Sequence, residues 1–139
     1  MRNLTVAITV DDKMGIAFNK RRQSRDKKLI EDLCKKTDGD IYISSYSALL
    51  FEEFNDRIRI VDDPLSECPD GGCCFVEMTH LGEYIDDVST LIIYHWNRLY
   101  PADKKIDVDI NNSGFKMVAK YEFCGNSHDK ITKGIYKKQ

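Results

Sequence analysis

The sequence predicts an α/β fold with a mixed, mainly parallel sheet, an antiparallel C-terminal pair of strands and helices on both faces. Three observations predict it. Residues 4–10 form a nearly unbroken apolar and β-branched run, which is typical of a central strand buried on both faces. Short strand-like runs then alternate with helix-like segments, and two strand-like runs joined by a polar loop end the chain.

The remaining elements follow from local patterns. Leu29, Ile30, Leu33 and Cys34 recur at helical spacing, so a helix is expected to begin near Ser24, whose hydroxyl would cap it. Further strands are expected at residues 41–43, 58–61, 73–76, 90–98, 106–110, 115–123 and 131–136, helices at 48–54 and 81–88, and a loop at 62–72.

Residues 20–28 carry a dense positive charge, with Lys or Arg at six of nine positions. They lead into the first predicted helix, whose free amides and positive dipole end favour a phosphate or a carboxylate. Cations at a helix start are otherwise mildly unfavourable. The segment therefore predicts the mouth of an anion-binding site, and a solvated surface patch is the alternative interpretation.

The composition is that of an ordinary globular protein, with 32% charged and 42% hydrophobic residues and a net charge of -2. Its 139 residues are enough for one domain, which we expect to span 1–139. No apolar run approaches the roughly 20 residues that cross a bilayer, and no N-terminal leader is visible. We therefore expect a cytoplasmic protein that contacts no membrane, with its five cysteines reduced.

The order and spacing of these elements resemble those of the dihydrofolate reductase family. The similar segments are TVDDKMGIAFN in the first strand and glycine loop, DIYIS, CCFVEM, STLIIYHW and, near the end, FKMVAKYEF. The resemblance in element order and spacing spans nearly all 139 residues. The resemblance implies one dihydrofolate reductase-like domain that is shorter than usual for the family.

The family's functional motifs differ in this chain. Its proline-tryptophan pair after the glycine loop is replaced by basic residues near Arg21 and Arg22. The family's pterin-binding carboxylate is expected near Leu29, where no acid stands, and Asp26 and Glu31 are the nearest substitutes. The glycine pair that lets NADPH approach the backbone is Glu77-Met78 here, and the arginine-threonine pair has become 45–47. Side chains in place of the glycines would crowd a pyrophosphate. We therefore expect no cofactor, with NADPH left open.

The chain also resembles a group of short bacterial proteins that carry a ribonuclease Z label. The shared motifs lie at 18–26, 94–103 and 127–136. Zinc-dependent ribonucleases with that label use a histidine-rich cluster, and this chain has three dispersed histidines. The spacing of Cys68, Cys73 and Cys74 fits no common zinc site either. No metal is expected.

Three functions remain open from the sequence. The leading hypothesis is a domain that has lost folate reduction and binds a phosphate-bearing small molecule or RNA, with oligomeric state unspecified. The alternatives are a metal-independent ribonuclease or phosphodiesterase with His128 or His95 as its acid or base, and an NADPH-dependent reductase with altered motifs. The residues expected to bind the phosphate-bearing ligand are Asn19, Arg21, Arg22, Gln23, Ser24, Arg25, Trp96, Asn97 and Arg98.

Overall fold

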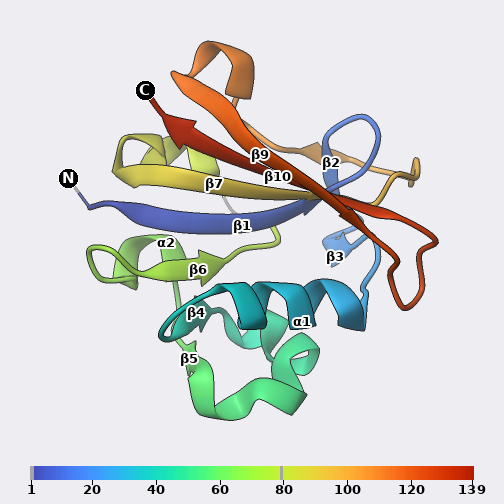
Figure 1. Cartoon of the computed structure of the whole chain (residues 1–139), viewed down its shortest axis with the longest axis horizontal. Coiled ribbons are helices and arrows are strands. Elements are labelled where there is room, and N and C mark those ends of the chain that lie inside the picture. Colours follow the sequence, from blue (N-terminus) through green and yellow to red (C-terminus); the bar gives the residue numbers. More distant parts are fainter. Residues whose placement is uncertain (1, 79) are drawn as a thin grey trace.

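The computed structural model describes residues 2–78 and 80–139, and its centre is a seven-stranded sheet (Figure 1). The strand order is β5-β4-β6-β1-β7-β10-β9. β10 runs antiparallel to its neighbours β7 and β9. The remaining pairs, from β5 through β4, β6 and β1 to β7, are parallel. The strands are β1 (Leu4–Val10), β4 (Ile41–Ile43), β5 (Ile58–Ile60), β6 (Cys73–Phe75), β7 (Val88–His95), β9 (Phe115–Phe123) and β10 (Ile131–Lys138). The predicted mainly parallel sheet is confirmed.

β1 lies in the middle of the sheet, between β6 and β7. Its side chains alternate between two apolar cores, because successive residues of a strand point to opposite faces. Leu4, Val6, Ile8 and Val10 enter one core, and Ala7 enters the other. The unbroken apolar run in the sequence is thus explained by burial on both faces.

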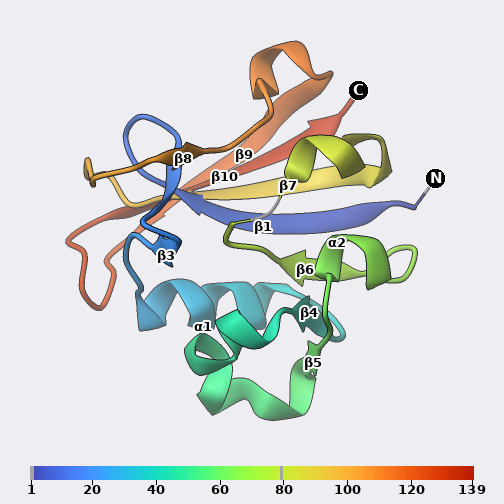
Figure 2. The same ribbon diagram turned by 180° about the vertical axis from the view of Figure 1, so that it is seen from behind.

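Helical segments cover both faces of the sheet, as Figures 1 and 2 show. One core packs against α1 (Lys27–Lys36) and the 3₁₀ segment η1 (Ser45–Arg57), and the other against α2 (Pro64–Glu67) and η2 (Leu81–Asp87). The helices expected at 48–54 and 81–88 are therefore present, but as 3₁₀ turns. The predicted loop at 62–72 contains α2, whose first residue is a proline. No helix of the described residues has both the length and the apolar character needed to span a membrane.

A second, three-stranded sheet was not predicted. It consists of β2 (Gly15–Phe18), β3 (Arg21–Arg22) and β8 (Lys104–Lys105), in the order β3-β2-β8. Asn19 and Lys20 form the β2–β3 turn with positive φ values of 53° and 60°. The first part of the basic segment therefore lies in a hairpin, and only Lys27 and Lys28 lie in the first turn of α1.

Two local predictions were wrong. Asp26, not Ser24, is the N-cap of α1, because the Asp26 side chain accepts the amide of Lys28. The strand expected at 106–110 is absent: β8 ends at Lys105, and the 3₁₀ segment η3 (Ile110–Asn112) follows. Ile106 and Val108 still pack against the core. The alternation of apolar and acidic residues in this segment therefore reflects burial of the apolar side chains and not pairing with another strand.

Candidate functional site

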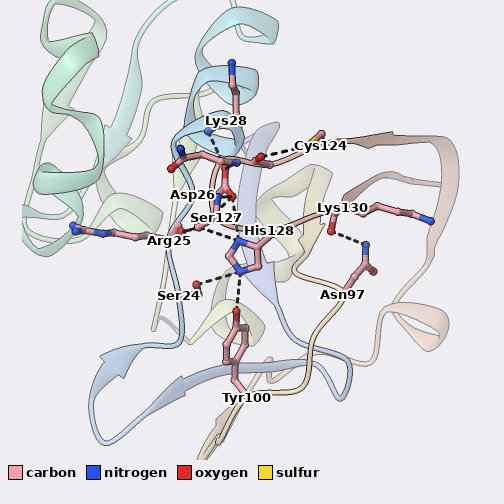
Figure 3. Close-up of polar contacts among 12 residues, drawn as sticks. Ser24, Arg25, Asp26, Lys28, Asn97, Tyr100, Cys124, Ser127, His128 and Lys130 are labelled. Carbon is pink, nitrogen blue, oxygen red and sulfur yellow. Dashed lines mark hydrogen bonds and ion pairs between the residues drawn. The ribbon is translucent and has the colours of Figure 1, made fainter.

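The candidate site lies at the carboxyl ends of β1 and β7, where the start of α1 meets the loop between β9 and β10 (Figures 1 and 3). Asp26 and Ser24 come from the segment that leads into α1, and His128 comes from the β9–β10 loop. Trp96 and Tyr100 follow the end of β7. Ligands of open α/β sheets usually bind at this edge.

Asp26 is buried, with 3% of its surface exposed, and it holds the two segments together. Its carboxylate accepts the amides of Lys28, Asn126 and Ser127 at 2.8–2.9 Å and faces Nδ1 of His128 at 3.1 Å. Burial opposes ionisation of the carboxyl. The hydrogen bonds from the two loop amides, His128 and Lys28 outweigh it and hold the pKa of Asp26 below its usual value. The carboxylate is therefore ionised at neutral pH.

His128 is equally buried, and each of its ring nitrogens faces a partner. Nδ1 lies 3.1 Å from both Oδ2 of Asp26 and Oγ of Ser127. Because an ionised carboxylate only accepts hydrogen bonds, Nδ1 carries a proton toward Asp26. In the neutral imidazole, Nε2 is then the acceptor, which is the arrangement of a general base.

Nε2 of His128 faces two hydroxyl groups. Oγ of Ser24 lies 3.2 Å away and the phenol oxygen of Tyr100 lies 2.8 Å away. The indole ring of Trp96 stacks on the imidazole, with 4.5 Å between centroids and an interplanar angle of 22°. The ring is thus fixed in plane by Trp96 and in rotation by Asp26.

A second polar cluster surrounds Arg22. Its guanidinium makes a bidentate ion pair with Glu77, at 2.7 and 3.0 Å, and the Ser47 hydroxyl donates to the same carboxylate at 2.7 Å. The guanidinium carbon also lies 4.3 Å from the ring centroid of Tyr46. The hydrogen bond to Glu77 raises the pKa of Arg22 against the opposing effect of burial. Arg22 is therefore neutralised by an internal partner.

A third cluster fixes the glycine loop. Asp11 is buried and accepts the amides of Lys13 and Gly15 at 2.8 and 2.7 Å and the side-chain amide of Gln23 at 2.9 Å. Burial disfavours its charge, but these hydrogen bonds lower the pKa of Asp11 overall. A Cβ on Gly15 would lie 2.7 Å from Cβ of Ala102, so the close approach requires glycine. Gln23 is thus engaged in positioning the loop, and its Oε1 is buried without a hydrogen bond among the described residues.

The other predicted site residues lie at the periphery. Arg21, Arg25 and Arg98 are exposed. The backbone amide of Asn19 donates to the Asp103 carboxylate. The side-chain amide of Asn97 donates to the backbone oxygen of Lys130 and to Oγ1 of Thr132. These two asparagines anchor loops around the site.

His95 does not join His128. It is the last residue of β7, where alternation places its side chain on the face opposite Tyr94 and Trp96. Burial lowers the pKa of His95, opposed by the charge of Asp12. The structure therefore separates the two histidines that the sequence offered as alternatives.

Little space is open beside the Asp26 cluster. A cavity lined by Ser24, Arg25, Asp26, Glu77 and Trp96, among others, has a volume of about 10 Å³, which holds roughly one water molecule. A larger hollow of about 440 Å³ lies at the opposite, amino ends of β4 and β6, between the 37–40 and 69–72 turns. None of the predicted site residues lines that hollow.

The cysteines form no metal centre among the described residues, where no group of three or more His, Cys, Asp or Glu side chains could hold an ion. Cys68, Cys73 and Cys74 are buried. Burial raises the pKa of Cys73 to about 11. These thiols therefore behave as core residues.

Several residues of the site were missing from the sequence-based set, among them Asp26, Tyr100 and Glu77. Each lies inside a motif quoted from the sequence, but its role depends on partners more than 25 residues away, such as Tyr100 with His128 and Glu77 with Arg22. An acid between basic residues, as at Asp26, was the available signal. Local spacing does not show which distant loop such an acid binds.

Comparisons with known proteins address the fold. No family model and no curated protein matches the sequence. Among solved structures, the chain is similar to the dihydrofolate reductase from Enterococcus faecalis complexed with NADP(H) and RAB-propyl, with a TM-score of 0.65 and 10% sequence identity over 97% of this chain and 95% of that chain. At that identity the likeness establishes architecture, since one fold hosts many functions. The chain therefore has a dihydrofolate reductase-like fold.

Proposed function

We propose that this dihydrofolate reductase-like domain binds a phosphate-bearing ligand, a nucleotide or a short RNA, at the carboxyl edge of its sheet. The observation that carries the proposal is that aromatic and cationic side chains lie next to each other on the β2–β3 hairpin and on the adjoining start of η1. Phe18, which is 47% exposed, lies directly opposite Arg21 in the ladder, and Tyr46, 40% exposed, stacks on Arg22 next to it. Aromatic faces that stack on bases beside cations that bind phosphate are the usual components of single-strand recognition.

Within this surface, the arginines have different roles. Arg22 is bound to Glu77, so it holds the hairpin against η1 and presents Tyr46. The charge available to a phosphate comes from the exposed Arg21 and Arg25, with Lys20 and Lys28 nearby in the chain. Guanidinium groups bind phosphate oxygens in a bidentate geometry.

The loss of folate reduction is part of the same proposal. Glu77 occupies the position where the family has a glycine, and its carboxylate is engaged by Arg22 and Ser47. A cofactor pyrophosphate there would have to displace a buried ion pair, which costs several kcal/mol. The space of about 10 Å³ beside Asp26 supports the same conclusion for a pterin.

The test is a thermal-shift titration with mononucleotides, dinucleotides, short RNAs and NADPH. Binding to the native state raises the melting temperature. We expect a shift with nucleotides or RNA that Arg21→Ala/Arg25→Ala loses and that Lys116→Ala/Lys120→Ala, two exposed cations on β9, retains. Loss of two phosphate contacts should also lower the salt slope of RNA affinity by about 1.4.

Other outcomes would overturn the proposal. A shift with NADPH alone would support an NADPH-dependent reductase instead. Equal shifts in both double variants would place the ligand away from the hairpin.

The Asp26–His128 pair favours a second candidate, a hydrolase of the ribonuclease or phosphodiesterase type that needs no metal. A histidine whose Nδ1 is oriented by a carboxylate is a suitable base near neutral pH. RNA cleavage that persists in EDTA and disappears in His128→Gln would support it. Cleavage that EDTA abolishes would contradict it.

A further inference from the structure

We infer that Ser24, His128 and Asp26 form a serine nucleophile triad whose substrates are carboxylic esters. Nothing in the phosphate-binding proposal requires this activity, and the two can fail separately. The inference rests on the order of contacts in Figure 3: hydroxyl to imidazole to carboxylate.

The distances match the requirements of an activated serine. Oγ of Ser24 lies 3.2 Å from Nε2 of His128, and Nδ1 of His128 lies 3.1 Å from Oδ2 of Asp26. A nucleophile within hydrogen-bond reach of a base that a third group orients is the general signature of covalent catalysis. The carboxylate is ionised because four hydrogen bonds to it outweigh its burial.

The side chains around His128 hold its imidazole in a fixed position beside Ser24. The side chains of His128 and Asp26 are 1% and 0% exposed, and Trp96 lies flat against the imidazole. Ser24, by contrast, is partly exposed. Ser24 is thus the least buried of the three residues.

Ser24 also lies three residues before Lys27, the first residue of the ten-residue helix α1. Negative charge that develops on a carbonyl oxygen near Ser24 would be close to the positive end of that helix. The exposed guanidinium of Arg25 is next in the chain. The positive charge of Arg25 favours the tetrahedral oxyanion over the neutral ester, whereas the helix end is already occupied by the Asp26 carboxylate, which accepts the Lys28 amide.

The reaction balances with water as its only co-substrate. The Ser24 hydroxyl proton passes to Nε2 of His128 as Oγ bonds to the ester carbonyl carbon, and the C–O bond to the alcohol then breaks while Nε2 returns that proton to the leaving oxygen. A water molecule next gives a proton to Nε2 and its oxygen to the acyl carbon. The acyl–Oγ bond breaks, and Ser24 recovers the proton from Nε2.

Tyr100 competes with Ser24 for the same nitrogen. Its hydroxyl lies 2.8 Å from Nε2, closer than Oγ of Ser24. Replacement by phenylalanine removes that hydroxyl and leaves the nitrogen to Ser24. If His128 activates Ser24, removal of the Tyr100 hydroxyl should therefore not slow the reaction of Ser24. A histidine with a purely structural role gives no reason to expect this.

The experiment is labelling of the folded protein with diisopropyl fluorophosphate, followed by intact mass and peptide mapping. We expect one adduct on Ser24, formed as Oγ bonds to phosphorus, fluoride leaves and the proton passes to His128. Ser24→Ala should abolish the adduct, and His128→Gln should slow its formation at least about 100-fold and remove its dependence on pH. Ser45→Ala, an exposed serine of η1, is the matched control and should label like the wild type.

Tyr100→Phe should label at least as fast as the wild type. Slower labelling in this variant, an adduct on another residue, or an unchanged rate in His128→Gln would each overturn the triad. Melting curves establish that each variant is folded, and melting curves with nucleotide or RNA added report the phosphate site separately from the labelling. Hydrolysis of p-nitrophenyl acetate then reports turnover in the same variants.

Discussion

Asp26 and His128 lie 102 positions apart in the chain, yet the carboxylate of one meets Nδ1 of the other at 3.1 Å inside the protein. The same carboxylate caps α1 and binds two amides of the β9–β10 loop. One side chain therefore joins the first helix to the last hairpin. The candidate site exists only because this junction forms.

Removal of the Asp26 carboxylate should be strongly destabilising. Asp26→Ala leaves His128 and three amides without their acceptor, and each buried donor that loses its partner costs about 1–3 kcal/mol. Urea unfolding followed by circular dichroism measures the loss. Asp129→Ala, an exposed acid in the same loop, should change stability little, and equal effects of the two variants would contradict the assignment.

The contribution of Asp26 should depend on pH in a defined direction. Its pKa is lowered in the folded state, while the unfolded value is about 3.9. The stabilisation is therefore present above that unfolded value and disappears as pH falls through the folded pKa. The stability difference between the wild type and Asp26→Asn should hold near pH 5 and shrink toward pH 3, in parallel urea titrations. A difference that grows on acidification would exclude this explanation.

Glu77 should be essential to the hairpin that carries the proposed ligand surface. Glu77→Ala leaves the partly buried guanidinium of Arg22 and the buried Ser47 hydroxyl without an acceptor, at a cost of about 3–5 kcal/mol. Glu77→Gln keeps one acceptor oxygen and should lose less. Glu122→Gln, which breaks the exposed pair with Lys130, is the control and should have little effect. The reverse order of losses would place the important pair at Lys130.

The sequence predicted the strands better than the site. Residues 115–123 match β9 and the run at 4–10 matches β1; burial on both faces explains the apolar run of β1, whereas most side chains of β9 are exposed. The β2–β3 hairpin was missed because its turn uses Asn19 and Lys20 at positive φ instead of glycine. Ser24 was the predicted N-cap of α1, but the Asp26 carboxylate accepts the Lys28 amide and is held there by the amides of Asn126 and Ser127. Contacts between distant loops leave no periodic pattern in a sequence.

Gly125 tests how tightly the junction is packed. A Cβ at this position would overlap Oδ2 of Asp26 and lie 2.8 Å from the carbonyl oxygen of His128 and 2.9 Å from Cδ1 of Ile131. Gly125→Ala should therefore push the β9–β10 loop away from α1, at a cost of about 1–3 kcal/mol. Gly82→Ala is the control, because its nearest neighbour is the flexible Asp107 side chain at 3.3 Å. Amide hydrogen exchange should show faster exchange at Asn126 and Ser127 only in Gly125→Ala, since these amides bind Asp26. If Gly125→Ala loses stability while exchange at Asn126 and Ser127 is unchanged, the β9–β10 loop has tolerated the methyl group. The strain would then be relieved in another part of the protein.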